Sequence, residues 1–157
     1  MATKTNAVRI VQQSGIPCRE EFYEFDENDL NGNHAAAAIG KPPEEVFKTL
    51  VARGERTGIN VFCIPVCCEL NLKKAAKAAG DKNMELIHVK ELLPLTGYIR
   101  GGCSPVGMKK KYPTYFDETC QLYEEIAVSA GARGHQMLLP PESLAELVGA
   151  KFVDIIQ

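Results

Sequence analysis

The sequence predicts a mixed α/β fold of the α+β kind, in which a curled or barrel-like β-sheet is flanked by helices. The chain has 157 residues, 45% of them apolar and 24% charged, which is enough for one globular core without disulfides or metal. Strand-like segments outnumber long helical ones, and some are joined by polar turns typical of hairpins. A doubly wound parallel sheet would place a helix between successive strands, so we expect instead a single mixed domain over residues 1–157.

The first forty residues predict two helices and one strand. Residues 5–14 place apolar side chains at helical spacing, and a glycine and a proline then end the helix. Residues 18–25 alternate partly between the two faces of a strand, before the polar loop 26–33 interrupts the pattern. The alanine-rich residues 34–39 predict a short helix that ends at Gly40.

A hairpin and an amphipathic helix follow. Residues 42–45 are typical of a first helical turn, with proline early and two acidic side chains behind it. Residues 46–52 and the apolar residues 60–66 predict two strands, and the polar residues 53–58 between them predict a turn. Residues 70–79 carry leucine and alanine on one face with lysines opposite, as an amphipathic helix does.

The second half of the chain predicts short elements around a glycine-rich loop. Residues 84–89 predict a strand, and residues 90–93 a short helix that Pro94 ends. The loop 98–107 combines glycines with a proline, so its backbone is exposed or closely approached, and we treat it as a candidate site loop. The remaining chain predicts, in order, strands over 114–116, 125–129 and 136–139, a turn over 130–134, a helix over 141–148 and a strand over 151–155.

The charge balance excludes binding to nucleic acid through bulk positive charge. Eighteen basic and 20 acidic residues give a net charge of -2. The run Lys109, Lys110 and Lys111 is the local candidate for a nucleic-acid contact, with a solvated loop as the alternative. No apolar run approaches the ~20 residues that cross a bilayer, and the chain starts without an apolar export signal. We therefore expect a cytoplasmic protein with no membrane partner.

The cysteines predict reduced thiols, several of them buried as small apolar side chains. Zinc would need well-spaced ligand pairs, but two of the cysteines are adjacent and the three histidines are isolated in the sequence. We expect neither a metal nor another cofactor. The six cysteines are Cys18, Cys63, Cys67, Cys68, Cys103 and Cys120.

Two features could carry chemistry. Lys48 lies among apolar residues, where it either extends from a strand face into solvent or points into a cleft. A lysine is charged at neutral pH, so its natural role in a cleft would be to hold a phosphate or a carbonyl oxygen. Gly101 and Gly102 present backbone N–H groups without side-chain cover, which suits the same ligands, although a tight turn explains them equally well.

A serine nucleophile is not expected in the glycine-rich loop. The segment from Gly102 to Gly107 looks like the G-x-S-x-G motif of hydrolases, but its second glycine comes one residue too late. Pro105 follows Ser104 and has no backbone N–H, so it could not contribute to an oxyanion hole.

Six motifs in order along the chain resemble the YbaK/EbsC family. This family comprises trans-acting relatives of the prolyl-tRNA synthetase editing domain, and the sequence is most similar to its Cys-tRNA(Pro) deacylase branch. The resemblance covers nearly the whole chain. The motifs are Lys4–Arg9, Val46–Leu50, Glu69–Lys77, Thr96–Tyr98, Gly101–Lys110 and Val128–Gly134.

The resemblance implies hydrolysis of the ester that joins a wrong amino acid to the 3′ end of tRNA. It implies that Lys48 is the essential lysine, with Thr49 beside it, and that Gly101 and Gly102 face the substrate carbonyl. It places two further residues, Tyr23 and Ser129, in the pocket. In this branch the thiol of the substrate attacks its own ester, and the enzyme positions the groups. Two departures from the family pattern bear on which amino acid is accepted: Phe25 stands where relatives often carry histidine, and Gln136 where we expect an acidic residue.

Two functions of different class remain open at this point. The first is an editing hydrolase that holds the acceptor end of an aminoacyl-tRNA, with prolyl-tRNA synthetase as the partner that selects the tRNA. The second is a non-catalytic module of the same fold that binds tRNA or a protein. Retention of Lys48 and the glycine pair favours the enzyme.

Overall fold

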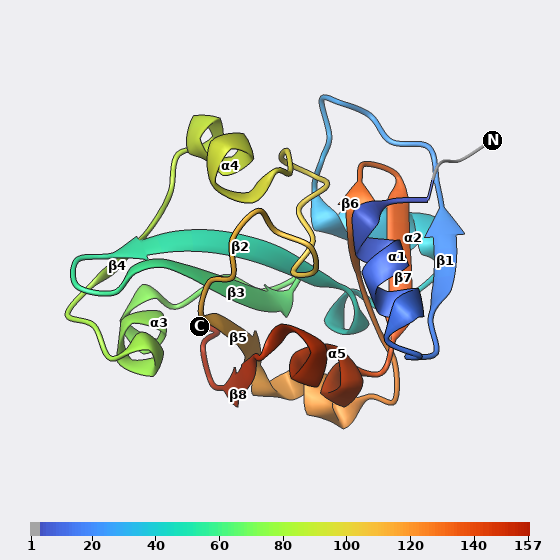
Figure 1. Ribbon diagram of the computed structural model, residues 1–157. Helices are drawn as coiled ribbons and strands as arrows, with labels where there is room; N and C mark the ends of the chain where they lie inside the picture. The colour runs from blue at the N-terminus through green and yellow to red at the C-terminus, as the bar shows by residue number, and fades with distance from the viewer. Residues whose placement is uncertain (1–3) are drawn as a thin grey trace.

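Two β-sheets meet in the computed structural model, which describes residues 4–157 (Figure 1). The smaller is antiparallel with strand order β1-β7-β6, and the larger is mixed with order β4-β2-β3-β5-β8. The strands are β1 (Arg19–Phe22), β2 (Phe47–Gly54), β3 (Gly58–Pro65), β4 (Met84–Leu86), β5 (Thr114–Asp117), β6 (Ile126–Ala132), β7 (His135–Leu139) and β8 (Lys151–Val153). The predicted α+β arrangement is confirmed, and the described residues contain no closed barrel.

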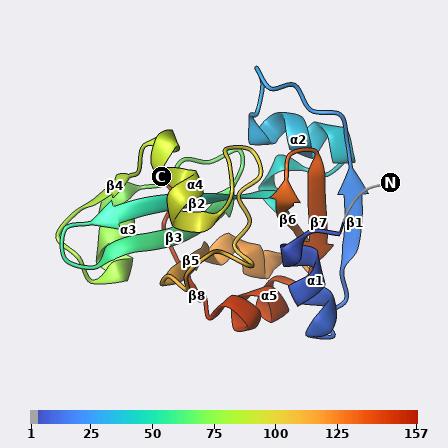
Figure 2. The same cartoon turned by 45° about the horizontal axis from the view of Figure 1, so that its top comes forward.

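Five short helices surround the sheets. In Figure 2, α2 lies next to the small sheet and α4 over the β2–β3 hairpin. Leu92 of α4 packs there against Val51 and Val61, so this helix covers one face of the hairpin. The helices are α1 (Asn6–Gln13), α2 (Gly32–Ile39), α3 (Leu72–Ala79), α4 (Val89–Thr96) and α5 (Pro141–Val148), and 3₁₀ turns span Pro43–Glu45 and Glu118–Leu122.

Side-chain caps fix where the helices begin. The side chain of Asn31 accepts the N–H of Asn33, so α2 begins at Gly32, two residues before its predicted start. Asn71 caps α3 in the same way by accepting the N–H of Lys74. Both helices end at a glycine in the left-handed conformation, as predicted.

Helix α4 passes through the proline that was predicted to end it. Pro94 lies inside the helix, which continues to Thr96. A proline removes one backbone hydrogen bond from a helix. Two side-chain hydrogen bonds stabilise this last turn instead. Within the helix, the Thr96 hydroxyl donates to the Leu92 carbonyl at 2.7 Å, and from outside it the Tyr112 hydroxyl donates to the Leu95 carbonyl at 2.7 Å.

The strand ends differ from prediction where tertiary pairing decides them. Strand β1 ends at Phe22, since its partner β7 begins at His135. Strand β6 continues past its predicted end to Ala132 through an irregularity between Ser129 and Ala132. The β2–β3 hairpin is confirmed, and its strands extend to Gly54 and Gly58.

Asp81 holds the hairpin turn from outside. Its carboxylate accepts the backbone N–H groups of Arg56 and Thr57 and the Thr57 hydroxyl, the last at 2.7 Å. These hydrogen bonds, the Thr57 hydroxyl first, hold the pKa of Asp81 well below its usual range.

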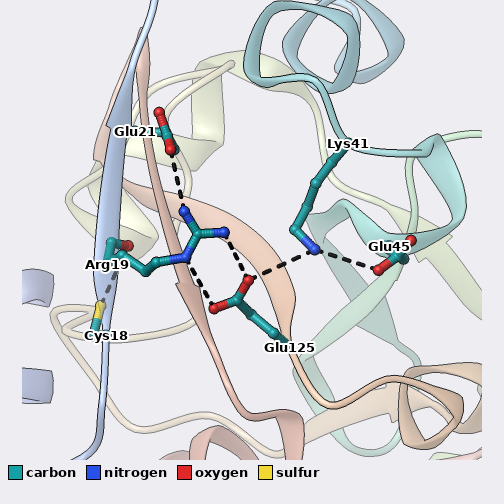
Figure 3. A network of polar contacts seen from close by, with 6 residues as sticks. All are labelled: Cys18, Arg19, Glu21, Lys41, Glu45 and Glu125. Atoms are coloured by element: carbon teal, nitrogen blue, oxygen red, sulfur yellow. Dashed lines mark hydrogen bonds and ion pairs between the residues drawn. The ribbon is translucent and has the colours of Figure 1, made fainter.

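The two sheets join at one point. Val46, just before β2, forms a parallel bridge with Ala127 of β6, and beyond this bridge the two strands diverge. A network of charged side chains lies on the small sheet beside the junction (Figure 3). Arg19 of β1 donates two hydrogen bonds to Glu125, and Lys41 lies within ion-pair distance of both Glu125 and Glu45. Because β2 and β6 are bridged only at Val46 and Ala127, an opening lies between them beyond this bridge.

Candidate functional site

A cleft of about 740 Å³ lies where β2 and β6 diverge. Strand β2 forms its floor with Phe47–Val51, and Ser129 and Gln136 contribute from the small sheet. The other walls come from loop segments, the first turn of α2, the end of β4 and the first turn of α4. They are Tyr23, Leu30–Asn33, Ala35, Val66–Glu69, Leu86–Val89, Leu92, Arg100, Gly101 and Cys103.

The floor of the cleft is an open strand edge. Strand β4 pairs with β2 only at Ala52–Gly54, and Ile87 N–H donates to the Val51 carbonyl at 3.1 Å just beyond it. On the opposite edge, Val66 N–H donates to the Val46 carbonyl at 2.8 Å. Backbone groups of alternate residues point to alternate edges, so the N–H and carbonyl of Thr49 point to the same open edge as the Val51 carbonyl.

Lys48 lines this cleft, which agrees with the second of its two predicted placements, a lysine that points into a cleft. It is half-buried in β2 and lies beside Leu50 at the boundary with an adjoining groove, which extends toward the start of α3. Among residues 4–157 no acidic side chain lies within ion-pair distance of Lys48, so its ammonium group is uncommitted. A free cation on the cleft wall can stabilise an oxyanion or a phosphate.

Burial raises the pKa of three protein thiols in or beside the cleft. Thr49 Oγ1 and Cys63 Sγ share a hydrogen bond of 3.5 Å, and burial raises the pKa of the Cys63 thiol to about 12. Burial likewise raises the pKa of Cys103 to about 12 and that of Cys68 to about 11. The thiolate is the nucleophilic form, so these cysteines are poor nucleophiles at neutral pH. All six cysteines are free in the structure, and their reduced state stays a prediction.

The two glycines of the loop differ in role. The Gly102 N–H donates to the Ile99 carbonyl at 2.9 Å, which closes a turn in which Gly101 has φ +86°. A positive φ at the third position of a turn favours glycine. A Cβ on Gly102 would lie 3.1 Å from the backbone of Ala132 and Arg133. Only Gly101 lines the cleft, so Gly102 shapes the turn and its close packing, and its N–H is already used.

Ser129 and Gln136 are direct cross-strand neighbours in β6 and β7. Ser129 Oγ accepts the N–H of Gly131 at 3.2 Å, which leaves its hydroxyl proton free to donate. Gln136 is buried, and its Oε1 has no hydrogen-bond partner. Tyr23, which follows β1, lines the cleft as well.

The structure does not bring the lysine run to the cleft. Lys109 N–H donates to the Thr96 carbonyl at 3.0 Å, beyond the end of α4, and Lys111 lies near Gly149 after α5. Ser104 is buried, and its Oγ accepts the Val106 N–H, which agrees with its predicted lack of a nucleophilic role.

Sequence reasoning missed Arg100. It lines the cleft directly before Gly101, and its carbonyl accepts Arg133 Nε–H at 2.8 Å. The adjacent glycines were the available signal, since they mark a loop on which a neighbouring arginine lies close to any bound anion.

Within the described part of the chain, no three histidine, cysteine, aspartate or glutamate side chains gather as a metal-binding group. None of the helices over residues 4–157 has the length and apolar character needed to span a membrane.

The chain belongs to the aminoacyl-tRNA editing domain family, which it matches over residues 32–147. The proposed Cys-tRNA(Pro)/Cys-tRNA(Cys) deacylase EbsC of Enterococcus faecalis (strain ATCC 700802 / V583) is 47% identical over 152 residues, covering 97% of this chain and 93% of that protein. YwhH of Bacillus subtilis (strain 168), an uncharacterized protein, is 25% identical over 133 residues, 84% of each chain. These matches confirm the family resemblance inferred from the motifs.

Solved structures share the fold. A crystal structure of a proposed trans-editing enzyme for prolyl tRNA synthetase has a TM-score of 0.81 and 26% identity, covering 99% of both chains. The hypothetical protein APE2540 has a TM-score of 0.85 at 23% identity, covering 95% of this chain and 97% of that one, and shows the fold alone.

Proposed function

We propose that this protein is a trans-editing hydrolase that cleaves the aminoacyl ester of mischarged tRNA, with Cys-tRNA(Pro) as its preferred substrate. One observation carries the proposal. A single cleft in an editing-domain fold gathers Lys48, Thr49, Gly101, Tyr23 and Ser129, while burial raises the pKa of the wall thiols Cys68 and Cys103. Such a cleft can position an ester without supplying a nucleophile of its own.

The mechanism uses the thiol of the substrate. The cysteinyl sulfur bonds to the ester carbonyl carbon, the bond from that carbon to the 3′ oxygen breaks, and the thiol proton ends on the 3′ oxygen of tRNA. Water then opens the cyclic thioester to free cysteine. The Lys48 ammonium and the Gly101 N–H stabilise the negative charge on the carbonyl oxygen during the first step.

The tRNA reaches the cleft through its 3′ acceptor end. Lys109, Lys110 and Lys111 contact phosphates outside the cleft, and prolyl-tRNA synthetase is the partner that selects the tRNA. The protein acts in the cytoplasm. The support for these assignments is the exposed position of the three lysines and the structural likeness to a proposed trans-editing enzyme for prolyl tRNA synthetase.

The test is ester release from charged tRNA(Pro). The purified protein is incubated with tRNA(Pro) carrying cysteine, alanine, proline or 2-aminobutyrate, which matches cysteine in shape but lacks the thiol. We expect rapid release of cysteine and little release of 2-aminobutyrate. Equal release of both would contradict the substrate-assisted mechanism. Binding of charged tRNA without release of any amino acid would identify the non-catalytic module instead.

A further inference from the structure

Gln136 carries the one buried side-chain oxygen of the cleft wall that lacks a hydrogen-bond partner in the described residues. Its Oε1 is fully buried and has no hydrogen-bond partner within residues 4–157. Leaving a buried acceptor unpaired costs free energy that a native fold rarely accepts without a reason. The side chain lines the cleft on the same face as Ser129, its cross-strand partner. A ligand in the cleft is therefore the natural source of the missing donor.

The rest of the cleft is rich in donors. Lys48 has an uncommitted ammonium group, Ser129 has a free hydroxyl proton, and Gly101 presents a backbone N–H. These groups suit the oxygens of an ester or a phosphate. A protonated amine can only donate, so it needs an acceptor. The Glu69 carboxylate and the Thr49 carbonyl also line the cleft, but Gln136 Oε1 is the buried side-chain oxygen of its wall that lacks a donor within residues 4–157.

We infer that Gln136 recognises the α-amino group of the aminoacyl ester, through a hydrogen bond from that amine to Oε1. The inference rests on the proposed function, because it takes the ester of an amino acid as the ligand. The terminal torsion of a glutamine side chain is broad, so a modest rotation turns the oxygen toward the cleft. A ribose hydroxyl is the weaker candidate, since it can accept from Ser129 or Lys48 as well as donate.

The Gln136 side chain is a neutral amide, so it differs from a carboxylate at the same position in how it binds an amine. Gln136 Oε1 accepts from an amine whether that amine is protonated or not, and it adds no charge beside Lys48. Gln136 can therefore accept from the amino group in either protonation state, with the stronger hydrogen bond to the ammonium form.

The experiment compares two substrates on two enzymes. Cysteinyl-tRNA(Pro) and 3-mercaptopropionyl-tRNA(Pro) share the thiol and the ester, but the second lacks the amine. Their intrinsic reactivities differ, yet that difference cancels when the ratio of kcat/KM values is compared between wild type and Gln136→Met. We expect the ratio of kcat/KM for the amine-bearing substrate to that for the amine-free substrate to be about tenfold larger in wild type than in Gln136→Met. A factor of ten corresponds to one hydrogen bond to a buried partner.

The controls separate recognition from folding. Gln121→Met makes the same substitution at an exposed position outside the cleft and should leave the ratio unchanged. Thermal unfolding of Gln136→Met reports its stability, and an unstable variant is replaced by Gln136→Glu, which keeps an acceptor and should retain the preference for the amine. An unchanged ratio in Gln136→Met overturns the inference. A substrate with a 2′-deoxy terminal adenosine supplies a second test. The inference is also overturned if Gln136→Met changes the kcat/KM ratio for this 2′-deoxy substrate but not the ratio for the substrate without the amine, since Gln136 then contacts the ribose.

A binding measurement distinguishes this inference from the proposed function. An amide-linked 3′-cysteinylamino adenosine and its analogue without the α-amine are titrated into wild type and Gln136→Met by calorimetry. If wild type hydrolyses no charged tRNA but still prefers the amine in a Gln136-dependent way, the proposed function fails and the inference stands. If hydrolysis occurs and neither assay depends on Gln136, the inference alone fails.

Discussion

Lys48 is the residue on which the proposed chemistry depends most. Lys48→Ala should lower kcat by roughly 100- to 1000-fold, the usual cost of removing one group that stabilises an oxyanion. Its side chain makes no ion pair in the described structure, so the fold should be unaffected. The measurement is cysteine release from tRNA(Pro), with thermal unfolding alongside. Lys77→Ala, exposed on α3, is the matched control, and turnover near wild type in Lys48→Ala would remove this lysine from the mechanism.

The two loop glycines should respond differently to alanine. Gly101→Ala forces a side chain into a positive φ, at a cost of about 1–2 kcal/mol, and adds a methyl group to the loop glycine that lines the cleft. We expect it to reduce turnover per folded molecule. Gly102→Ala pushes against the backbone of Ala132 and Arg133, so its main effect should be a lower thermal midpoint. Urea titration and single-turnover kinetics on both variants check this, and the reverse pattern would show that the Gly102 amide acts on substrate.

At the residue scale, the family resemblance selected Lys48, Thr49, Tyr23, Gly101, Gly102 and Ser129. The structure brings five of them to one cleft and leaves Gly102 outside its lining, and the roles of all six stay predictions. Spacing alone could not have predicted this grouping, because the five residues come from separate segments whose proximity depends on how β6 leaves β2. The unpaired Gln136 oxygen was equally hidden, since an orphan acceptor is defined by what surrounds it in space.

At the scale of elements, the hairpin turn depends on one carboxylate. The pKa of Asp81 is depressed, so its stabilising bonds are present above about pH 4, the ordinary value for an aspartate, and weaken as the pH falls through the folded pKa. Asp81→Asn should therefore lower the free energy of unfolding at pH 7, and the gap to wild type should close between about pH 4 and pH 2. Urea unfolding of both proteins across this range tests it. A gap that is constant with pH would show that the charge is unimportant.

The three lysines after the glycine-rich loop are proposed to contact tRNA phosphates, and this contact can be tested by substitution. Replacing Lys109, Lys110 and Lys111 by glutamine should raise KM for charged tRNA and leave kcat unchanged. Each lost phosphate contact should reduce the slope of log affinity against log salt by about 0.7. The measurement is KM at several salt concentrations. An identical slope in the triple variant would mark the three lysines as a solvated loop.

Element boundaries were predictable where local capping sets them. Helix α5 begins at Pro141 and ends before Gly149, as its proline and glycine indicate. Helix α4 was not predictable to its end. Two donors from outside the helix support it beyond Pro94: the Lys109 N–H donates to the Thr96 carbonyl, and the Tyr112 hydroxyl donates to the Leu95 carbonyl. The end of β1 depends on where β7 begins, which no local pattern contains.

At the scale of the whole molecule, the charged network in Figure 3 links the small sheet to the segment before β2. Arg19 and Lys41 both reach Glu125, and hydrogen bonding from Arg19 lowers the pKa of that carboxyl. The network is partly solvated, so Glu125→Ala should cost at most about 1 kcal/mol of unfolding free energy and less in high salt. Urea unfolding at two salt concentrations measures it. A larger, salt-independent loss would mean that the network fixes the angle between the sheets.

The open edge of β2 bears on how the protein avoids self-association. An unpaired strand edge is a template onto which a strand from another molecule can add, and such edges are a common origin of aggregation. Here the free edge at Thr49 lies at the bottom of a cleft, between the turn before α2 and the segment that leads into α4. A slender ligand can enter this recess, whereas a second polypeptide flanked by its own sheet is too broad to do so. The fold thus keeps one strand edge available for recognition and hides it from its own copies.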